Sequence, residues 1–312
     1  MSHIFTTGVA GFKGRFRLIV SRTDGTVTKD SGWFDNLITD NGLDFPAIGP
    51  TQPFGGRFMF PGCFVGTGSA APAFTDTSLQ AYLATHNSAG PALPGDNNTY
   101  TASLPPYYKH YSSYRFGTGT AAGNISEIAV GASPTNIFNR ALILDGLGAP
   151  TTITVLIDEV LDVIYEFRVY PPTVDETNTF VLNGVGQTVS SRAYDIASVP
   201  DIMRGIRRDG PYDTASNFVT TNSTGLAPLT GSPTGPYAGP SGSNTVFDSY
   251  VVGSRELGFT NYYALGDCVG TWKGLLIAWS HGTRQIHLVT PIVKSNAQQM
   301  TIAGKFVWNR YP

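Results

Sequence analysis

Apolar and polar residues alternate along the middle of the chain. In residues 161–170 (LDVIYEFRVY) every odd position is apolar and most even positions are charged. This period of two predicts a β-strand with one buried face and one face mostly exposed to water. Residues 151–157 (TTITVLI) alternate in the same way, and residues 139–144 (NRALIL) precede them across a DGLGAP turn. Together the three segments predict an antiparallel meander, because such sheets tolerate one solvated face.

Extended segments also lie towards both ends of the chain. Residues 15–34 predict a β-hairpin, because RFRLIV and TVTKDSGWF stand on either side of an Asp24-Gly25 turn signal. Strands are predicted again at 274–279, 284–292 and 300–308. The pattern is therefore that of a mainly β protein.

Two short helices are predicted between these strands. Asp35 or Asn36 is suited to cap the first helix, which Gly42 limits to about two turns. A second cap signal occurs in TDTSLQAYLA at 75–84, where the apolar side chains recur with helical spacing and are expected to face inward.

Long segments rich in Gly, Pro, Ser, Thr and Asn separate the strands, at 86–106 and 210–246. The second is about three times longer than most loops in a compact domain, so it is interpreted as an extended surface loop or an arm ordered against another subunit. The predicted fold is mainly β: an antiparallel β-sandwich-like domain with two short helices and long loops. The chain is long enough for a single domain over 1–312 or for two closely packed β subdomains that divide near 173–210.

Charge is scarce along this chain. Only 13% of its residues are charged and the formal net charge is −2, whereas aromatic residues make up 12%. Low charge and many aromatics suit a surface partly covered by neighbouring subunits. No basic run occurs, and the densest cluster (Arg204, Arg207 and Arg208) has acidic neighbours, which favours a solvated turn over a nucleic-acid or phosphate site.

No apolar run approaches membrane-spanning length and no signal peptide is recognisable, so we expect synthesis in a cytoplasm and no membrane insertion.

Two short motifs were tested for enzyme chemistry. AWSHG at 278–282 has the form of a nucleophile elbow around Ser280, but a strand pattern follows it where the elbow requires a helix. No Asp or Glu occurs after Asp267, so the acid of that triad order is missing as well. VGTGS at 65–69 follows a strand, but no nearby Lys completes a phosphate loop. Both motifs are interpreted as turns.

Metal ligands and paired carboxylates give no stronger signal. Asp158, Glu159 and Asp162 offer oxygen ligands but lack the Gly-centred spacing of a calcium loop, so they are interpreted as a polar strand end. Cys63 and Cys268 are interpreted as buried free thiols, although a disulfide between them stays open. The histidines are scattered along the chain: His3, His86, His110, His281 and His287. We therefore assign no catalytic, cofactor-binding or metal residue, and no cofactor.

The remaining polar and aromatic candidates have structural explanations. Asp35, Asp40 and Asp44 suit cap and turn positions. Tryptophans can stack on sugar rings, but each of these lies within or at the end of a predicted strand, which favours packing in a core or interface. They are Trp33, Trp272, Trp279 and Trp308.

Several segments resemble, in the same order, a group of virion proteins of tailed bacteriophages encoded among tail and appendage genes. They are GWFDNLITDNGLD (32–44), FVGTGSAAPAFTDTSLQAYL (64–83), ISEIAVG (125–131), FNRALILD (138–145), TTITVLIDEVLDVIYEFRVYPP (151–172) and PIVKSNAQQMTIAGKFVWNRYP (291–312). The resemblance covers about half of the chain, is weakest over 173–290, and consists of structural rather than catalytic motifs.

The resemblance implies a structural, non-enzymatic protein of the virion: a fibre, baseplate or connector-collar component of the tail. Its expected partners are copies of itself, as a trimer or hexamer, and other virion proteins, with no nucleic acid. The alternative is a receptor-binding module at a fibre tip that recognises host-surface glycan or a pilus through aromatic loops around Tyr107–Tyr108 and Tyr262–Tyr263. A glycan depolymerase is the remaining alternative, but no carboxylate pair stands out for it.

Overall fold

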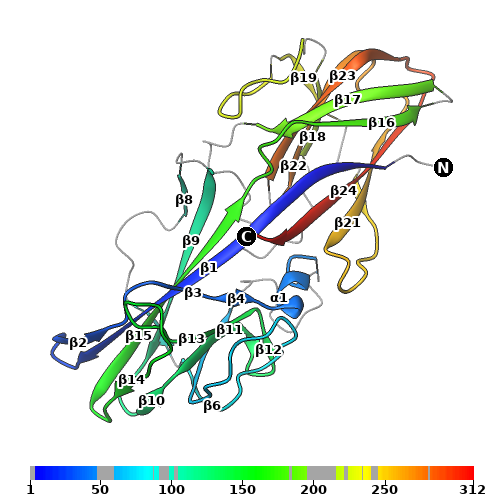
Figure 1. Ribbon diagram of the computed structural model, residues 1–312. Coiled ribbons are helices and arrows are strands. Elements are labelled where there is room, and N and C mark those ends of the chain that lie inside the picture. Colours follow the sequence, from blue (N-terminus) through cyan, green and yellow to red (C-terminus); the bar gives the residue numbers. More distant parts are fainter. Residues whose placement is uncertain are drawn as a thin grey trace. The chain divides into compact units, whose positions relative to one another are not determined.

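The protein is mainly β, as predicted, with several antiparallel sheets (Figure 1). The computed structural model describes residues 4–47, 60–86, 88–90, 98–101, 105–182, 185–194, 216–220, 224–233, 235–239, 245–279 and 282–312. The chain divides into two compact units: unit 1 is Met1–Gly11, Tyr100–Tyr107 and Tyr170–Pro312, and unit 2 is Phe12–Thr99 and Tyr108–Val169. No helix within the described residues is long and apolar enough to cross a membrane.

One sheet of unit 2 is built on long strands. Its central order is β1–β15–β9–β7, and the short β2 and β3 also pair with β1. The strands are β1 (Ile4–Arg22), β2 (Val27–Asp30), β3 (Phe34–Asp35), β7 (Ser88–Ala89), β9 (Tyr107–Phe116) and β15 (Glu159–Tyr170), and β8 (Asn98–Thr101) pairs with β9. The β1–β2 hairpin is confirmed, with Gly25 at φ 89° in its turn, a conformation that glycine adopts without strain.

The second sheet of unit 2 has the order β4–β13–β11–β5–β6. Its strands are β4 (Leu37–Ile38), β5 (Gly62–Gly66), β6 (Tyr82–Thr85), β11 (Glu127–Ser133) and β13 (Asn139–Leu142), with β12 (Asn136–Ile137) on β11. A separate pair joins β10 (Gly123–Ile125) to β14 (Ile153–Val155). Phe138 connects the two larger sheets, because its ring lies 5.6 Å from that of Phe167 on β15 and 4.6 Å from that of Phe60.

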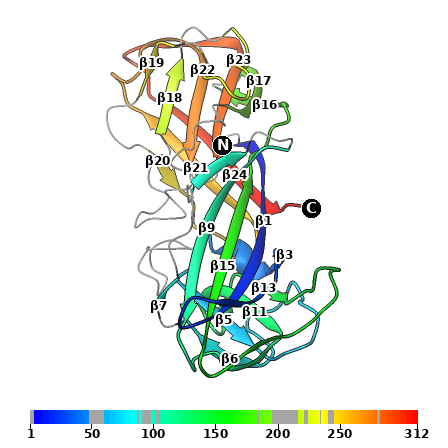
Figure 2. The ribbon, with the colours of Figure 1, turned by 90° about the vertical axis from the view of Figure 1, so that its left-hand side faces the viewer.

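Unit 1 contains a six-stranded sheet with the order β16–β17–β23–β22–β18–β19 (Figure 2). Its strands are β16 (Glu176–Leu182), β17 (Val185–Ala193), β18 (Ser216–Thr220), β19 (Tyr237–Ala238), β22 (Gly270–Trp279) and β23 (Gly282–Lys294). A second run of strands in the unit joins β20 (Thr245–Phe247), β21 (Glu256–Tyr263) and β24 (Met300–Arg310), and β24 pairs with β1. Parts of 210–246 therefore belong to a sheet, because β18 pairs with both β22 and β19.

The predicted helices are only partly correct. The first is α1 (Asp40–Asp44), but its cap is Thr39, whose hydroxyl accepts a hydrogen bond from Gly42 N at 2.9 Å, while Leu37 and Ile38 form β4 instead. The second helix is absent, since 75–81 is irregular and Tyr82–Thr85 is strand β6. The backbone amides of Gln80 and Ala81 donate to the Glu127 carboxylate, so they are not available for a helical turn.

The predicted meander is wrong. Strand β13 pairs with β11 and β4, β14 pairs with β10, and β15 pairs with β9 and β1. The prediction that one face of 161–170 is exposed to water is also wrong, because Asp162 and Glu166 are buried. Arginines on other strands neutralise both carboxylates, so the charged face of this strand needs no contact with water.

Candidate functional site

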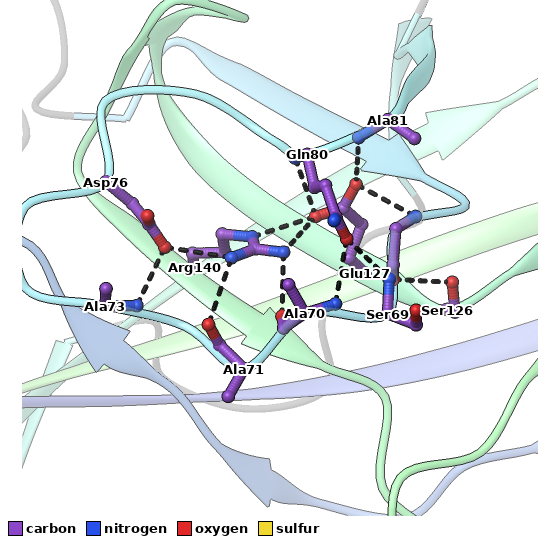
Figure 3. Close-up of polar contacts among 11 residues, drawn as sticks. Ser69, Ala70, Ala71, Ala73, Asp76, Gln80, Ala81, Ser126, Glu127 and Arg140 are labelled. Carbon is purple, nitrogen blue, oxygen red and sulfur yellow. Dashed lines mark hydrogen bonds and ion pairs between the residues drawn. The ribbon is translucent and has the colours of Figure 1, made fainter.

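A buried carboxylate organises the polar chemistry of unit 2 (Figure 3). Glu127, the first residue of β11, is 0% exposed. Its Oε1 accepts hydrogen bonds from the backbone amides of Gly68 at 3.1 Å and Ala81 at 2.7 Å, and its Oε2 accepts one from the amide of Gln80 at 3.0 Å. A carboxylate buried in this way requires donors on both oxygens, and the loop backbone supplies three of them.

Arg140 supplies the opposite charge from the neighbouring strand β13. Its Nε lies 2.8 Å from Glu127 Oε2, and its Nη1 lies 2.9 Å from Asp76 Oδ2. Its Nη2 donates to the carbonyl of Ala70 at 3.0 Å. The guanidinium, 3% exposed, thus uses its fixed fork of donors to join two carboxylates and the loop carbonyls of Ala70 and Ala71.

The partners of this ion pair all belong to one segment, residues 67–81, which we call the 67–81 loop. Gln80 Oε1 accepts hydrogen bonds from the amides of Ser69 and Ala70, both at 2.8 Å, and Asp76 Oδ2 accepts one from Ala73 at 2.8 Å. The Ser126 hydroxyl donates to the carbonyl of Gly68 at 2.8 Å. The loop is therefore fixed along most of its length although it contains no helix or strand.

Two glycines permit the close approach of this loop to Glu127. A Cβ at Gly66 would lie 2.6 Å from Glu127 Oε1, and a Cβ at Gly68 would lie 2.5 Å from the same atom. The Gly-Thr-Gly sequence that resembled part of a phosphate loop does bind an anion through its backbone, but the anion is the carboxylate of Glu127. VGTGS is not a turn: Val65 and Gly66 end strand β5 and residues 67–69 begin the irregular loop, and its carboxylate partner was not predicted.

The cluster of Glu127, Arg140 and the loop is built for support rather than for chemistry on a ligand. Both carboxylate oxygens are occupied by donors of the protein and lie away from solvent. The outer side of the loop carries small residues, Gln80 and Phe74, whose side chain is 51% exposed. The charged groups hold the loop from within, and the loop presents an uncharged surface.

A second buried carboxylate lies on β15. Glu166 forms a bidentate pair with Arg15, with both N–O distances 2.9 Å, and accepts a further hydrogen bond from Arg168 Nε. Burial acts to raise the pKa of Glu166, but the hydrogen bonds from Arg15, Tyr111 and Arg168 outweigh it and hold that pKa below its usual value. Burial and the neighbouring Glu166 together raise the pKa of Tyr111 to about 12. The Arg15 Cζ atom lies over the Trp33 ring, 4.4 Å from the ring centroid.

The acidic candidates near β15 are also held by protein groups. Glu159 accepts hydrogen bonds from the Thr28 hydroxyl at 2.7 Å and from the Leu156 amide at 2.8 Å. Asp162 forms a bidentate pair with Arg115. No group of three or more His, Cys, Asp or Glu side chains within the described residues is arranged to hold a metal ion. Glu159 begins β15 and Asp162 lies within it, both buried, whereas Asp158 is exposed in the turn that precedes the strand.

The other candidates do not converge on a site. Trp272 and Trp308 are fully buried in unit 1. Cys63 is a buried free thiol, as predicted, whereas Cys268 is free but only half-buried. The tyrosines expected in binding loops lie instead in strands β9 and β21, with Tyr108 and Tyr263 buried.

Some candidates lie outside the described residues, namely His3, Ser280, His281, Arg204, Arg207 and Arg208. Trp279, the last residue of β22, is opposite Gly282, the first residue of β23. Of the three aspartates, Asp35 forms an ion pair with Lys13 at 3.2 Å and Asp40 begins α1. Asp44 is its last residue and is buried.

No protein-family profile, curated protein or solved structure matches the chain.

Proposed function

We propose that the protein is a structural component of a bacteriophage tail, in a fibre, the baseplate or a connector-collar, and is made in the host cytoplasm before it enters the virion. It acts by assembling with copies of itself and by attaching to other virion proteins. The order of the segments that resemble tail and appendage proteins supports this assignment, as does the low charge of the chain.

The observation that carries the proposal is the rigid support of the 67–81 loop. Association costs conformational entropy when a loop must be ordered at an interface. Glu127 and Arg140 already fix this loop, and its exposed residues are small apart from Gln80 and the aromatic Phe74. Such a surface suits a permanent contact with another protein, where a fixed shape and an aromatic anchor contribute most to binding.

The test is to locate the protein in particles. An antibody raised against the recombinant chain should label tails of the phage whose genome encodes it, as seen by electron microscopy. Deletion of the gene should give particles with an incomplete tail, and the wild-type gene should restore it. A protein that is absent from purified particles would contradict the proposal.

The exposed Trp33 favours one second candidate, a receptor-binding module for host glycan or a pilus. Its side chain is 36% exposed, and its ring lies 6.0 Å from that of Tyr111. Neighbouring aromatic rings of this kind can stack on sugar rings. Binding of the purified protein to whole host cells, compared with its Trp33→Ala variant, separates this candidate from a purely structural role.

A further inference from the structure

Two aromatic rings and two cations lie in contact on the long-stranded sheet of unit 2, and we call Arg15, Trp33, Lys109 and Tyr111 the Trp33 cluster. The ring centroids of Trp33 and Tyr111 are 6.0 Å apart. Arg15 Cζ lies 4.4 Å from the Trp33 centroid, and Lys109 Nζ lies 5.5 Å from the Tyr111 centroid. Trp33 is 36% exposed and the other three residues are partly exposed, so the four side chains form one surface that water reaches.

Strand register fixes the charges around these rings. Strands β1, β15 and β9 are neighbours in the sheet (Figure 2). Tyr111 on β9 is directly opposite Glu166 on β15, and Lys109 is directly opposite Arg168. The buried Glu166 carboxylate already accepts hydrogen bonds from Arg15 and Arg168. The carboxylate nearest to the cluster is therefore engaged by arginines.

Lys109 departs from the usual rule of cross-strand pairing. Like charges directly opposite each other destabilise a strand pair, and here Lys109 faces Arg168. Within the part of the chain that the structure describes, Lys109 forms no ion pair with a carboxylate, and its ammonium contacts the Tyr111 ring instead. Local conflicts of this kind are expected at functional sites, where a ligand offsets them. A negatively charged group beside Lys109 would offset this repulsion.

We propose that the Trp33 cluster binds an anionic sugar unit of a host-surface glycan. The exposed part of the Trp33 indole contacts the apolar face of the sugar ring, and Lys109 pairs with the acidic group of the sugar. Tyr111 lies between them and contacts both. The aromatic surface favours a sugar over a bare inorganic anion, and the lysine favours an acidic sugar over a neutral one. The proposal rests on the receptor-binding candidate function and names its ligand class.

The test is binding of the purified protein to an array of acidic sugars, each beside its neutral counterpart. The array holds uronates with their methyl esters, sialosides with their desialylated forms, and phosphorylated sugars with the unphosphorylated ones. Wild type should bind at least one acidic sugar about tenfold more tightly than its counterpart, the effect of one hydrogen bond to a charged group. Trp33→Ala should lose binding to both forms, whereas Lys109→Met should lose the preference for the acidic one.

Matched control variants come from unit 1. Tyr262→Ala removes an aromatic side chain of a residue that is 38% exposed, and Lys305→Met removes a partly exposed lysine that pairs with Glu256. Both controls should bind the array as wild type does. Thermal melting followed by circular dichroism checks the fold: Lys109→Met should melt at or above the wild-type temperature, because it removes one of two like charges. A lower melting temperature would contradict the repulsion on which the proposal rests.

The outcomes separate the ligand class from the candidate function. The proposal is overturned if wild type binds acidic and neutral forms equally or binds no sugar of the array. Binding to whole host cells that persists in Lys109→Met also overturns it, while the receptor-binding candidate stands with another ligand. If wild type does not bind host cells at all, that candidate falls as well. The proposed place in the tail is tested separately, by antibody labelling of particles.

Discussion

Replacing Glu127 by Gln should destabilise unit 2 and release the 67–81 loop. The Gln oxygen can still accept the amides of Gly68 and Ala81, but its NH₂ group then faces the Gln80 amide and the Arg140 guanidinium, which are both donors. Arg140 keeps only Asp76 as a carboxylate partner.

The size of the effect follows from the burial of this pair. Removing one partner of a buried ion pair costs about 3–5 kcal/mol. The cost of Glu127→Gln is expected at the lower end, about 3 kcal/mol, because Arg140 still pairs with Asp76. For a unit of this size that loss lowers the melting temperature by about 6–12 °C. The matched control is Glu256→Gln, which breaks a partly exposed pair with Lys305 and should cost about 0–1 kcal/mol.

Calorimetry measures the melting temperature, and amide hydrogen exchange read by mass spectrometry measures the loop. Peptides from 67–81 should exchange faster in Glu127→Gln, because their amides lose a charged acceptor, while peptides of β21 and β24 in unit 1 should be unchanged. The double variant Glu127→Gln with Arg140→Met should cost less than the sum of the single variants, because neither charge is then left buried alone. If the unfolding free energy of Glu127→Gln lies within about 1 kcal/mol of wild type and the hydrogen exchange of the loop is unchanged, the carboxylate does not hold the loop.

Three further predictions follow from individual contacts. Gly68→Ala should destabilise the protein by about 1–3 kcal/mol and speed hydrogen exchange of the 67–81 loop, because the added methyl group would lie 2.5 Å from Glu127 Oε1. An unchanged melting curve would show that the loop can shift freely. The pKa of Glu166 lies lower in the folded protein than in the unfolded chain, so its stabilisation is present above about pH 4.5 and is lost as the pH falls through the folded pKa. Glu166→Gln should therefore lower the melting temperature near neutral pH and flatten its fall as the pH drops below about 4.5. Burial raises the pKa of both the Cys63 and the Cys268 thiol, but Cys268 is only half-buried. A thiol reagent should therefore modify Cys268 in the native protein and Cys63 only after unfolding. Equal rates of modification would contradict the buried position of Cys63.

Local patterns predicted the strands well because a period of two requires only neighbouring residues. The Asp24-Gly25 hairpin and the C-terminal strands are confirmed for that reason. The burial of 161–170 was misjudged, because its charged side chains find partners far along the sequence: Arg15 and Glu166 are 151 residues apart. A charged residue in a strand thus predicts either solvent or a distant ion partner, and one sequence does not distinguish the two.

The cluster around Glu127 was missed for the same reason. Its members come from β5 with the following loop, from β11 and from β13, and Gly68 lies 59 residues from Glu127. The sequence signal was a glycine-rich segment, which was considered as a loop that binds external phosphate rather than a carboxylate of the same chain. Similarly, the cap signal at 75–84 was overridden by tertiary contacts, because Glu127 binds the amides of Gln80 and Ala81.

The proposed function requires the protein to assemble with copies of itself. The most direct test is the molar mass of the purified wild-type chain by light scattering over a range of concentrations. Self-assembly predicts a defined oligomer, a trimer or a hexamer, at the corresponding multiple of 33.3 kDa. A single species of 33.3 kDa at every concentration would contradict the account.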